Sequence, residues 1–201
     1  MLTHLRLFRI VSTIGMITAL FSSLPFTPAS AQKKFDATSS FLSTTWYVAN
    51  TGNDANSCLA ADSPCETING ALAKVAPEDT IKVAIGTYTG TGTEVVQIDK
   101  NITISGGWNA AFTAQDGRSI IDGQEIRNGI YVNAAPYVVI DRFTIRNGGL
   151  GVHNFSGALT LNNSLVTGNV GGGVDNYGIM TINNTLITEN IAYSDCCSGG
   201  G

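Results

Sequence analysis

The segment ALTLNNSLVTGN at residues 158–169 returns as IMTINNTLITEN at residues 179–190, a shift of 21 residues. A looser third copy, VVIDRFTIRN, begins at Val138. Between the copies a second element recurs, GVHNF from Gly151 and GVDNY from Gly173, displaced by 22 residues. So regular a period indicates a repeat architecture in which each unit packs on its neighbours.

Each repeat contains short apolar runs that alternate with polar residues and are separated by Asn and Gly. Alternation predicts strands, because side chains two residues apart share one face. Three short strands per repeat favour an all-β solenoid that winds once per repeat, with coils about 4.8 Å apart. Parallel connections are right-handed as a rule, so we expect a right-handed parallel β-helix. The expected inward columns are Ile140, Leu161 and Ile182, and Ile145, Val166 and Ile187; the expected amide ladders are Asn162 over Asn183, and Asn169 over Asn190.

Two other solenoids have to be weighed against this interpretation. A leucine-rich repeat has a similar period and stays open as an alternative, but its pattern requires Asn where this sequence has Ser164 and Thr185. A left-handed hexapeptide helix is disfavoured because no six-residue period is visible.

Residues 45–79 read as an N-terminal cap, and residues 80–201 as the coils. We expect a strand at Thr45–Ala49 and a short amphipathic helix at Thr67–Val75, ended by Pro77. A helix across the end of a solenoid would cover its core and its unpaired strand edge. Further strands are expected at Ile81–Tyr88, Val95–Ile98 and Asn101–Trp108, in less regular early coils.

The first 31 residues are typical of a signal peptide, followed by a linker at residues 32–44. Arg6 and Arg9 precede an uncharged apolar run at 10–24, and Pro28-Ala29-Ser30-Ala31 supplies a cleavage site. The run is short for a bilayer span, although an uncleaved anchor is the alternative. We therefore expect a secreted or cell-surface protein with no transmembrane span in the mature chain.

Two cysteines bracket a short polar loop of this exported chain, and we expect Cys58 and Cys65 to form a disulfide. A metal site would need more ligands than the segment offers. Cys196 and Cys197 are adjacent, so each needs a partner elsewhere.

Nine Lys and Arg face fifteen Asp and Glu after the leader, a net charge near −6. No basic stretch could follow a phosphate backbone, which argues against nucleic acid as a partner.

Catalytic candidates are few. Asp141, Arg142 and Arg146 form a charged group among the coils, but Asp141 aligns with the turn residues Asn162 and Asn183 and reads as a corner aspartate. His153 aligns with Asp175 and reads as an exposed turn residue. These four residues are weak surface-site candidates, and no catalytic residue, metal ligand or cofactor is assigned. Residues 53–56, Asn-Asp-Ala-Asn, could hold calcium only weakly, because the spacing of a full calcium loop is missing.

The sequence stops at Gly201 where the preceding coil, with its three glycines at 171–173, leads into another strand. No C-terminal cap follows the last repeat, so we expect further coils beyond this point.

The stretch from Tyr47 through Gly90, YVANTGNDANSC to KVAIGTYTG, resembles the N-terminal cap and first coil of bacterial secreted pectin-lyase-like β-helix proteins. ITISGGW, VVIDRFTIRNGG and the NNSLVTGN runs are similar to their later coils and to polymorphic outer-membrane protein repeats. The resemblance covers Trp46 to Gly201 and implies a right-handed parallel β-helix with a short N-terminal capping helix.

Such scaffolds carry lyases, hydrolases, adhesins and structural modules, so the resemblance says little about activity. The paired Asp and Gly-His-Gly motifs of its hydrolase members are missing here. We expect a structural, adhesive or carbohydrate-contacting module whose partner is a polysaccharide or cell-surface glycan. The alternative is a polysaccharide lyase or glycoside hydrolase.

Overall fold

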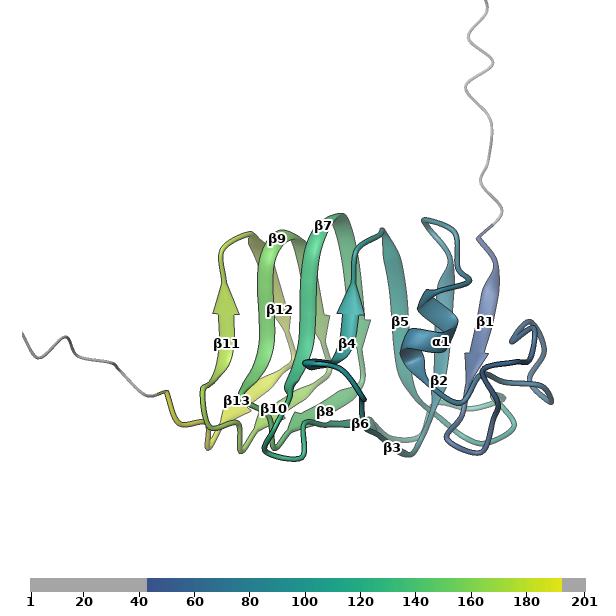
Figure 1. The fold of residues 1–201 in the computed structure, drawn as a ribbon, viewed down its shortest axis with the longest axis horizontal. Coiled ribbons are helices and arrows are strands. Elements are labelled where there is room, and N and C mark those ends of the chain that lie inside the picture. Colours follow the sequence, from purple (N-terminus) through teal and green to yellow (C-terminus); the bar gives the residue numbers. More distant parts are fainter. Residues whose placement is uncertain (1–42, 193–201) are drawn as a thin grey trace, which may run out of the picture. The chain divides into compact units, whose positions relative to one another are not determined.

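The structure is a computed structural model that describes residues 43–192, and these form two parallel β-sheets and one short helix (Figure 1). Every pairing between the named strands of the two sheets is parallel. Sheet A contains β1 (Thr45–Val48), β2 (Thr80–Ala84), β4 (Glu94–Ile98), β5 (Ile102–Trp108), β7 (Asn128–Asp141), β9 (Leu150–Asn162), β11 (Gly172–Asn176) and β12 (Ile179–Asn183). Sheet B contains β3 (Thr87–Tyr88), β6 (Ser119–Asp122), β8 (Phe143–Arg146), β10 (Leu165–Thr167) and β13 (Leu186–Thr188).

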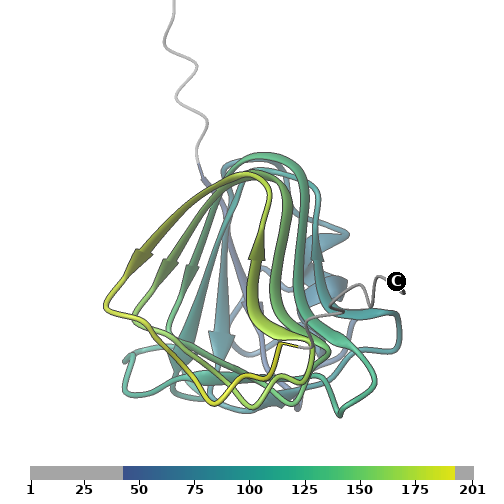
Figure 2. The same ribbon diagram turned by 90° about the vertical axis from the view of Figure 1, so that its left-hand side faces the viewer.

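The predicted stacking of residues about 21 apart is confirmed. Leu161 pairs with Ile140 on one side and with Ile182 on the other. In sheet B, Val166 pairs in the same way with Ile145 and Ile187. Each repeat therefore adds one strand to sheet B and one or two to sheet A, and the chain runs in nested turns (Figure 2).

Sheet A is strongly curled. In the middle coils, two of the expected short strands are joined into one bent strand. β4 and β5 pair with the first and last parts of β7, and β11 and β12 pair likewise with β9. β7 and β9 remain paired round the bend, through Asn133 with Ser156 and Ala135 with Gly157. Each of the two is therefore one continuous strand. Residues 81–88 show the opposite outcome: the sequence predicts one strand there, and the structure contains two. A break after Ala84 divides it between β2 in sheet A and β3 in sheet B.

A mostly aliphatic core fills the space inside these turns, and a smaller cluster of Ala49, Ala84 and Phe112 is separate from it. Isoleucine, leucine and valine columns from both sheets face inward, as the alternation predicted. The fully buried members include Ile81, Ile104, Ile140 and Leu161 from sheet A and Ile121, Ile145 and Val166 from sheet B.

Stacked asparagines occupy the corners, and both predicted amide ladders form. Asn183 Nδ2 donates to Asn162 Oδ1 at 2.9 Å, and Asn169 Nδ2 donates to Asn190 Oδ1 at 2.8 Å. A third ladder joins Asn184 Nδ2 to Asn163 Oδ1 at 2.8 Å, and both residues have a left-handed φ, 46° and 51°. Asn tolerates this conformation better than most residues, which explains its recurrence at this corner.

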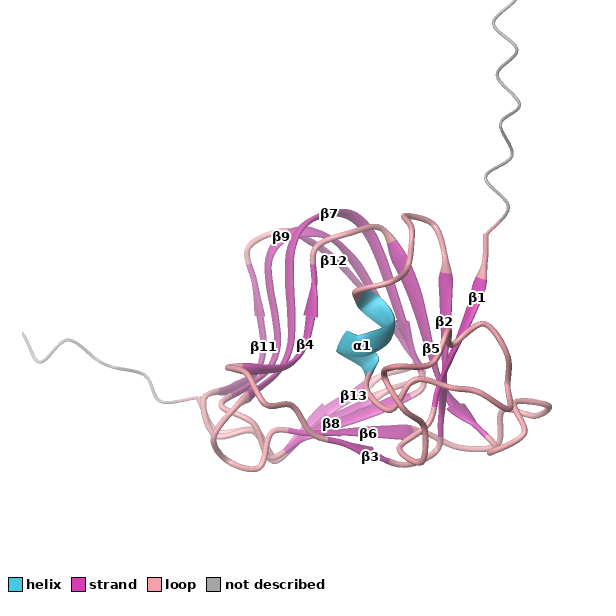
Figure 3. Cartoon of the chain, turned by 45° about the vertical axis from the view of Figure 1, so that its right-hand side comes forward, coloured by secondary structure: helices cyan, strands magenta, loops and turns pink. Residues whose placement is uncertain are grey.

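The segment expected to form the cap contains helix α1 (Ile68–Leu72), shorter than the predicted Thr67–Val75 (Figure 3). Thr67 is its N-cap and its hydroxyl oxygen accepts from the Gly70 N–H at 2.9 Å. Ile68, Ala71 and Leu72 are buried in the core cluster. The 67–75 apolar spacing was correct, but the chain leaves helical geometry after the first turns.

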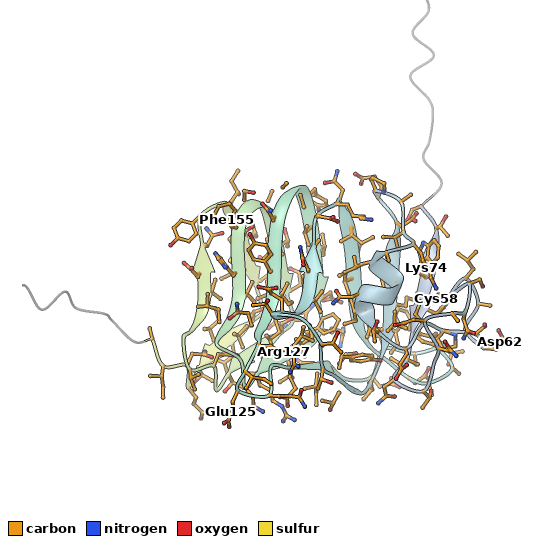
Figure 4. The ribbon with its side chains drawn as sticks, viewed as in Figure 1. Cys58, Asp62, Lys74, Glu125, Arg127 and Phe155 are labelled. Atoms are coloured by element: carbon orange, nitrogen blue, oxygen red, sulfur yellow. A yellow bond between two sulfur atoms is a disulfide. The ribbon has the colours of Figure 1, made fainter. Side chains whose placement is uncertain are left out.

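The predicted disulfide between Cys58 and Cys65 is present, beside Lys74 (Figure 4). Lys74 Nζ donates to the Asp54 carbonyl oxygen at 2.6 Å and lies 3.4 Å from Cys58 Sγ. The strand expected at Thr45–Ala49 is β1 and pairs with β2.

Several predictions fall outside residues 43–192: the signal peptide at 1–31, most of the linker at 32–44, the pair Cys196 and Cys197, and anything beyond Gly201. Within the described range, the structure contains no helix of the length and apolarity that a membrane crossing would need.

Candidate functional site

Asp141 and Arg142 lie together at the corner where sheet A leads into sheet B. Asp141 ends β7 and pairs in register with Asn162, as the sequence alignment predicted. Its Oδ1 accepts from Asn163 Nδ2 at 2.7 Å and its Oδ2 accepts from Gln115 Nε2 at 3.2 Å, whereas Arg142 Nε is 3.9 Å away. Both carboxylate oxygens of Asp141 therefore hold the corner together.

A shallow groove runs beside this corner. Arg118 is shared by its two halves, and the Arg118 Nε donates to the Asn163 carbonyl oxygen at 2.8 Å. Leu165 and Leu186 line the second half, and Leu165 pairs in register with Leu186 on one side and with Thr144 of the preceding coil on the other.

Arg146 belongs to a different corner. Its Nε lies 3.0 Å from Asp122 Oδ2, which also accepts from Asn147 Nδ2 at 3.1 Å. Arg146 is thus bound to Asp122 rather than to Asp141. The charged group suggested by the sequence is divided between two corners.

The prediction that His153 is an exposed turn residue is wrong. His153 lies inside β9, pairs with Tyr131 of β7 and with Asp175 of β11, and only 21% of its side chain is exposed. Its Nε2 is buried, makes no hydrogen bond within the described residues, and is 3.6 Å from Asp175 Oδ2. The GVHN and GVDN elements are strands because they continue the parallel ladder of sheet A.

His153 is part of a band of aromatic and polar side chains on the outer face of sheet A. Inward and outward positions alternate along each strand, so the buried Ile130, Val132 and Val152 leave Tyr131 and His153 on the other face. The register then stacks the outward residues of successive coils. We refer to this band as the aromatic strip; its residues are Gln97, Tyr131, His153, Phe155, Asp175 and Tyr177.

The rings of the aromatic strip form a continuous set of contacts. Tyr131 and His153 have centroids 5.2 Å apart, and His153 is 6.0 Å from Tyr177. Phe155 is 6.4 Å from both Tyr131 and Tyr177. Neighbouring planes are tilted by 36° to 86°, so the strip is corrugated rather than flat.

The outermost rings of the strip are those of Phe155, labelled in Figure 4, and Tyr177, and both are open to solvent. Phe155 is 52% exposed and Tyr177 is 72% exposed. A half-exposed phenylalanine gives up much of the hydrophobic free energy that its burial would provide. Neighbouring exposed aromatic rings are typical of binding surfaces. This surface joins apolar ring faces to hydrogen-bonding amide, carboxylate, imidazole and phenol groups.

Bonds beneath the strip fix its shape. Asn154 is fully buried one residue away from both His153 and Phe155, and its Nδ2 donates to Asn176 Oδ1 at 2.7 Å. The Tyr177 N–H donates to the Asn154 carbonyl oxygen at 2.8 Å. Phe155 directly follows Asn154, and Tyr177 directly follows Asn176 in the next coil. These bonds therefore hold the backbones of Phe155 and Tyr177 next to each other.

The residues suggested as a weak calcium site make hydrogen bonds within residues 53–67. Asp54 Oδ1 accepts from the N–H groups of Glu66 and Thr67, both at 2.9 Å, and its Oδ2 accepts from the Thr67 hydroxyl at 2.7 Å. Asn53 Oδ1 accepts from the Ala55 N–H. These oxygens anchor the loop to the start of α1. Across residues 43–192, no cluster of three or more His, Cys, Asp or Glu side chains could hold a metal ion.

No protein-family model matches the sequence, and no curated protein shows significant similarity to it. The fold and the surfaces described above are therefore what any functional conclusion has to rest on.

The sequence contains a signal for the aromatic strip, although the aligned residues are similar and not identical. GVHNF and GVDNY align at a shift of 22, which places Phe155 on Tyr177 as aromatic on aromatic. For Tyr131 the signal is weaker: Gly129-Ile130-Tyr131 aligns with Gly151-Val152-His153 at the same shift, but the match is short and the register shifts after Val132.

Proposed function

We propose that this protein is an exported, noncatalytic right-handed parallel β-helix module that contacts a polysaccharide or cell-surface glycan through the aromatic strip. The fold part of the proposal is supported by nested parallel coils and a curled sheet. In this proposal α1 is the cap of the first coil, consistent with the burial of Ile68 and Leu72.

The observation that carries the proposed glycan contact is the exposure of Phe155 and Tyr177 beside Asp175. A sugar ring presents C–H groups on its faces and hydroxyls on its edge. Exposed aromatic faces match the first, and carboxylate and amide oxygens match the second. Phe155 and Asp175 lie in strands and Tyr177 directly follows β11, so both kinds of group are held at fixed spacing, which reduces the entropy lost on binding.

The open side of the last coil supports a further part of the proposal, that another coil covers it in the native assembly. Ile182 and Ile187 are 44% and 40% exposed, although their column neighbours Leu161 and Val166 are fully buried. A further coil with the same apolar pattern would complete both columns and pair the strand edges that have no partner within residues 43–192.

A lyase or hydrolase is the alternative that the family resemblance suggested. Asp141 and Arg146 would be its charged groups, but each is bonded to corner residues, which favours a structural role. Incubation with polygalacturonate and related glycans, with and without calcium, measures cleavage directly. Products that disappear in Asp141→Ala or Arg146→Ala would favour the enzyme.

Affinity electrophoresis in gels containing a panel of soluble polysaccharides tests the glycan contact. We expect at least one polysaccharide to retard the protein, and Phe155→Ala with Tyr177→Ala to weaken that retardation about tenfold, as for central aromatic contacts.

Tyr137→Ala is the matched control. Tyr137 is 52% exposed, the same as Phe155, and lies on β7 outside the ring contacts of the strip. The Tyr137→Ala variant should be retarded by the polysaccharide as strongly as the unmodified protein is. Equal weakening by Tyr137→Ala and the double variant, with unchanged thermal unfolding, would show that general surface hydrophobicity causes the retardation.

A further inference from the structure

We infer that the aromatic strip selects neutral polysaccharides and discriminates against uronate or sulfated chains. This inference rests on the proposed glycan contact and names its ligand class.

The charge of the strip is the first argument. No Lys or Arg occurs in β4, in β11 or in the strip-forming segments 128–133 and 150–156. Asp175 is the acidic residue of the strip, and its side chain is 36% exposed. An anionic polysaccharide therefore meets a carboxylate without a compensating cation, in a mature chain whose net charge is already near −6.

Hydrogen bonding is the second argument. The exposed carboxylate of Asp175 is an acceptor that neutral sugar hydroxyls can satisfy by donation. A uronate carboxylate has no proton to donate at neutral pH, so the same contact would place two acceptors together. The Gln97 side chain, exposed at the other end of the strip in register with Tyr131, can donate or accept.

The cations of the coils lie elsewhere. Arg118 and Arg142 line the groove beside Asp141, and Arg146 is bound to Asp122. Lys82 lies over the Trp108 ring, Lys100 donates to the Leu72 carbonyl oxygen, and Arg127 donates to Gln124 Oε1. An acidic chain held by these arginines would follow the corner rather than the rings. The two surfaces therefore make opposite predictions about which variants reduce binding.

Pairs of polysaccharides that differ only in charge give the sharpest test. Hydroxyethyl cellulose and carboxymethyl cellulose share a backbone, as do methyl-esterified and free polygalacturonate. Affinity electrophoresis is run at low ionic strength and above the ordinary titration range of histidine. We expect the neutral member of a pair to retard the protein more strongly, and Phe155→Ala to abolish the difference.

Asp175→Asn should raise retardation by the acidic member about threefold, the effect of removing one exposed charge. Asp62→Asn, which removes an exposed charge from the disulfide loop, controls for net charge and should change nothing.

Stronger retardation by the acidic member, or equal retardation by both, would overturn the inference. If that binding is lost in Phe155→Ala, the proposed glycan contact stands and only its ligand class is wrong. If it is lost in Arg118→Ala instead, the strip is not the binding surface and both proposals fail.

Discussion

Two successive repeats with nearly the same sequence differ greatly in burial. Leu161 and Val166 of residues 158–169 are fully buried, whereas the equivalent Ile182 and Ile187 of residues 179–190 are 44% and 40% exposed. Both pairs point inward and pair in register. The difference arises because the first repeat has a coil on each side within the described residues, and the second has a coil on one side.

The comparison teaches that an apolar pattern in a stacked protein specifies direction, not burial. Alternation decides which side chains face the interior. The neighbouring coil is needed to exclude water from these side chains, so stability is shared between a repeat and its interfaces. Matched substitutions in the two repeats can measure that share.

The largest expected effect comes from truncating the same column position in each repeat. Leu161→Ala should lower the free energy of unfolding by about 3 kcal/mol, because it removes a fully buried side chain and leaves a cavity. Ile182→Ala should cost about 1 kcal/mol, since much of its side chain already contacts water. Urea unfolding followed by circular dichroism gives both values. Equal losses would mean that the last coil is covered as completely as the one before it.

A second comparison uses the corner amides. Asn169 is fully buried; its Oδ1 accepts from the Gly148 N–H at 2.9 Å, and its Nδ2 donates to the Ile145 carbonyl oxygen at 3.3 Å. Asn169→Ala strands these buried partners and should cost about 2 kcal/mol. Asn190→Ala should cost about 1 kcal/mol, because water at the open side can replace part of its bonding.

Urea unfolding again measures the cost of each amide substitution. Asn169→Asp is the control for shape: it keeps the volume, removes the donor, and should destabilise as much as alanine. A fully stable Asn169→Asp would show that the amide ladder contributes little.

The regular coils could be predicted from the sequence because their information is local and repeated. The columns of Leu161 and Val166 and the ladder of Asn162 follow from a period and an alternation, and all three are confirmed. The division of 81–88 was missed, because no second copy of that segment exists to show where the corner lies.

The aromatic strip was missed for a related reason. Apart from Phe155 and Tyr177 it combines unlike residues, Tyr131 over His153 and His153 over Asp175, so a search for matching residue types detects only one pair of its rings. It becomes visible only when the register is known. A functional surface on a repeat protein departs from the repeat, whereas the core keeps to it.

The opposite end of the stack, where α1 contributes buried side chains, allows a smaller and pH-dependent test. Asp79 is 4% exposed; its carboxylate accepts from the Thr44 and Ala76 N–H groups and from the Trp46 indole N–H, at 2.8 to 2.9 Å. Burial raises the pKa of Asp79, but these hydrogen bonds outweigh it and lower the pKa below 3.8.

A lowered pKa in the folded state means that the unfolded chain takes up the proton first as the pH falls. The stabilisation from Asp79 is therefore complete above the ordinary aspartate range and is lost as the pH falls through the lowered pKa. We expect Asp79→Asn to lose about 1.5 kcal/mol at neutral pH and progressively less in acid. Urea unfolding of both proteins across the acidic range measures this difference. Glu78→Gln, an exposed acid one residue away, is the control and should follow the unmodified protein. The difference in the free energy of unfolding between Asp79→Asn and the unmodified protein could instead stay constant down to strongly acidic pH. That result would mean that the carboxylate charge of Asp79 does not stabilise this end of the stack.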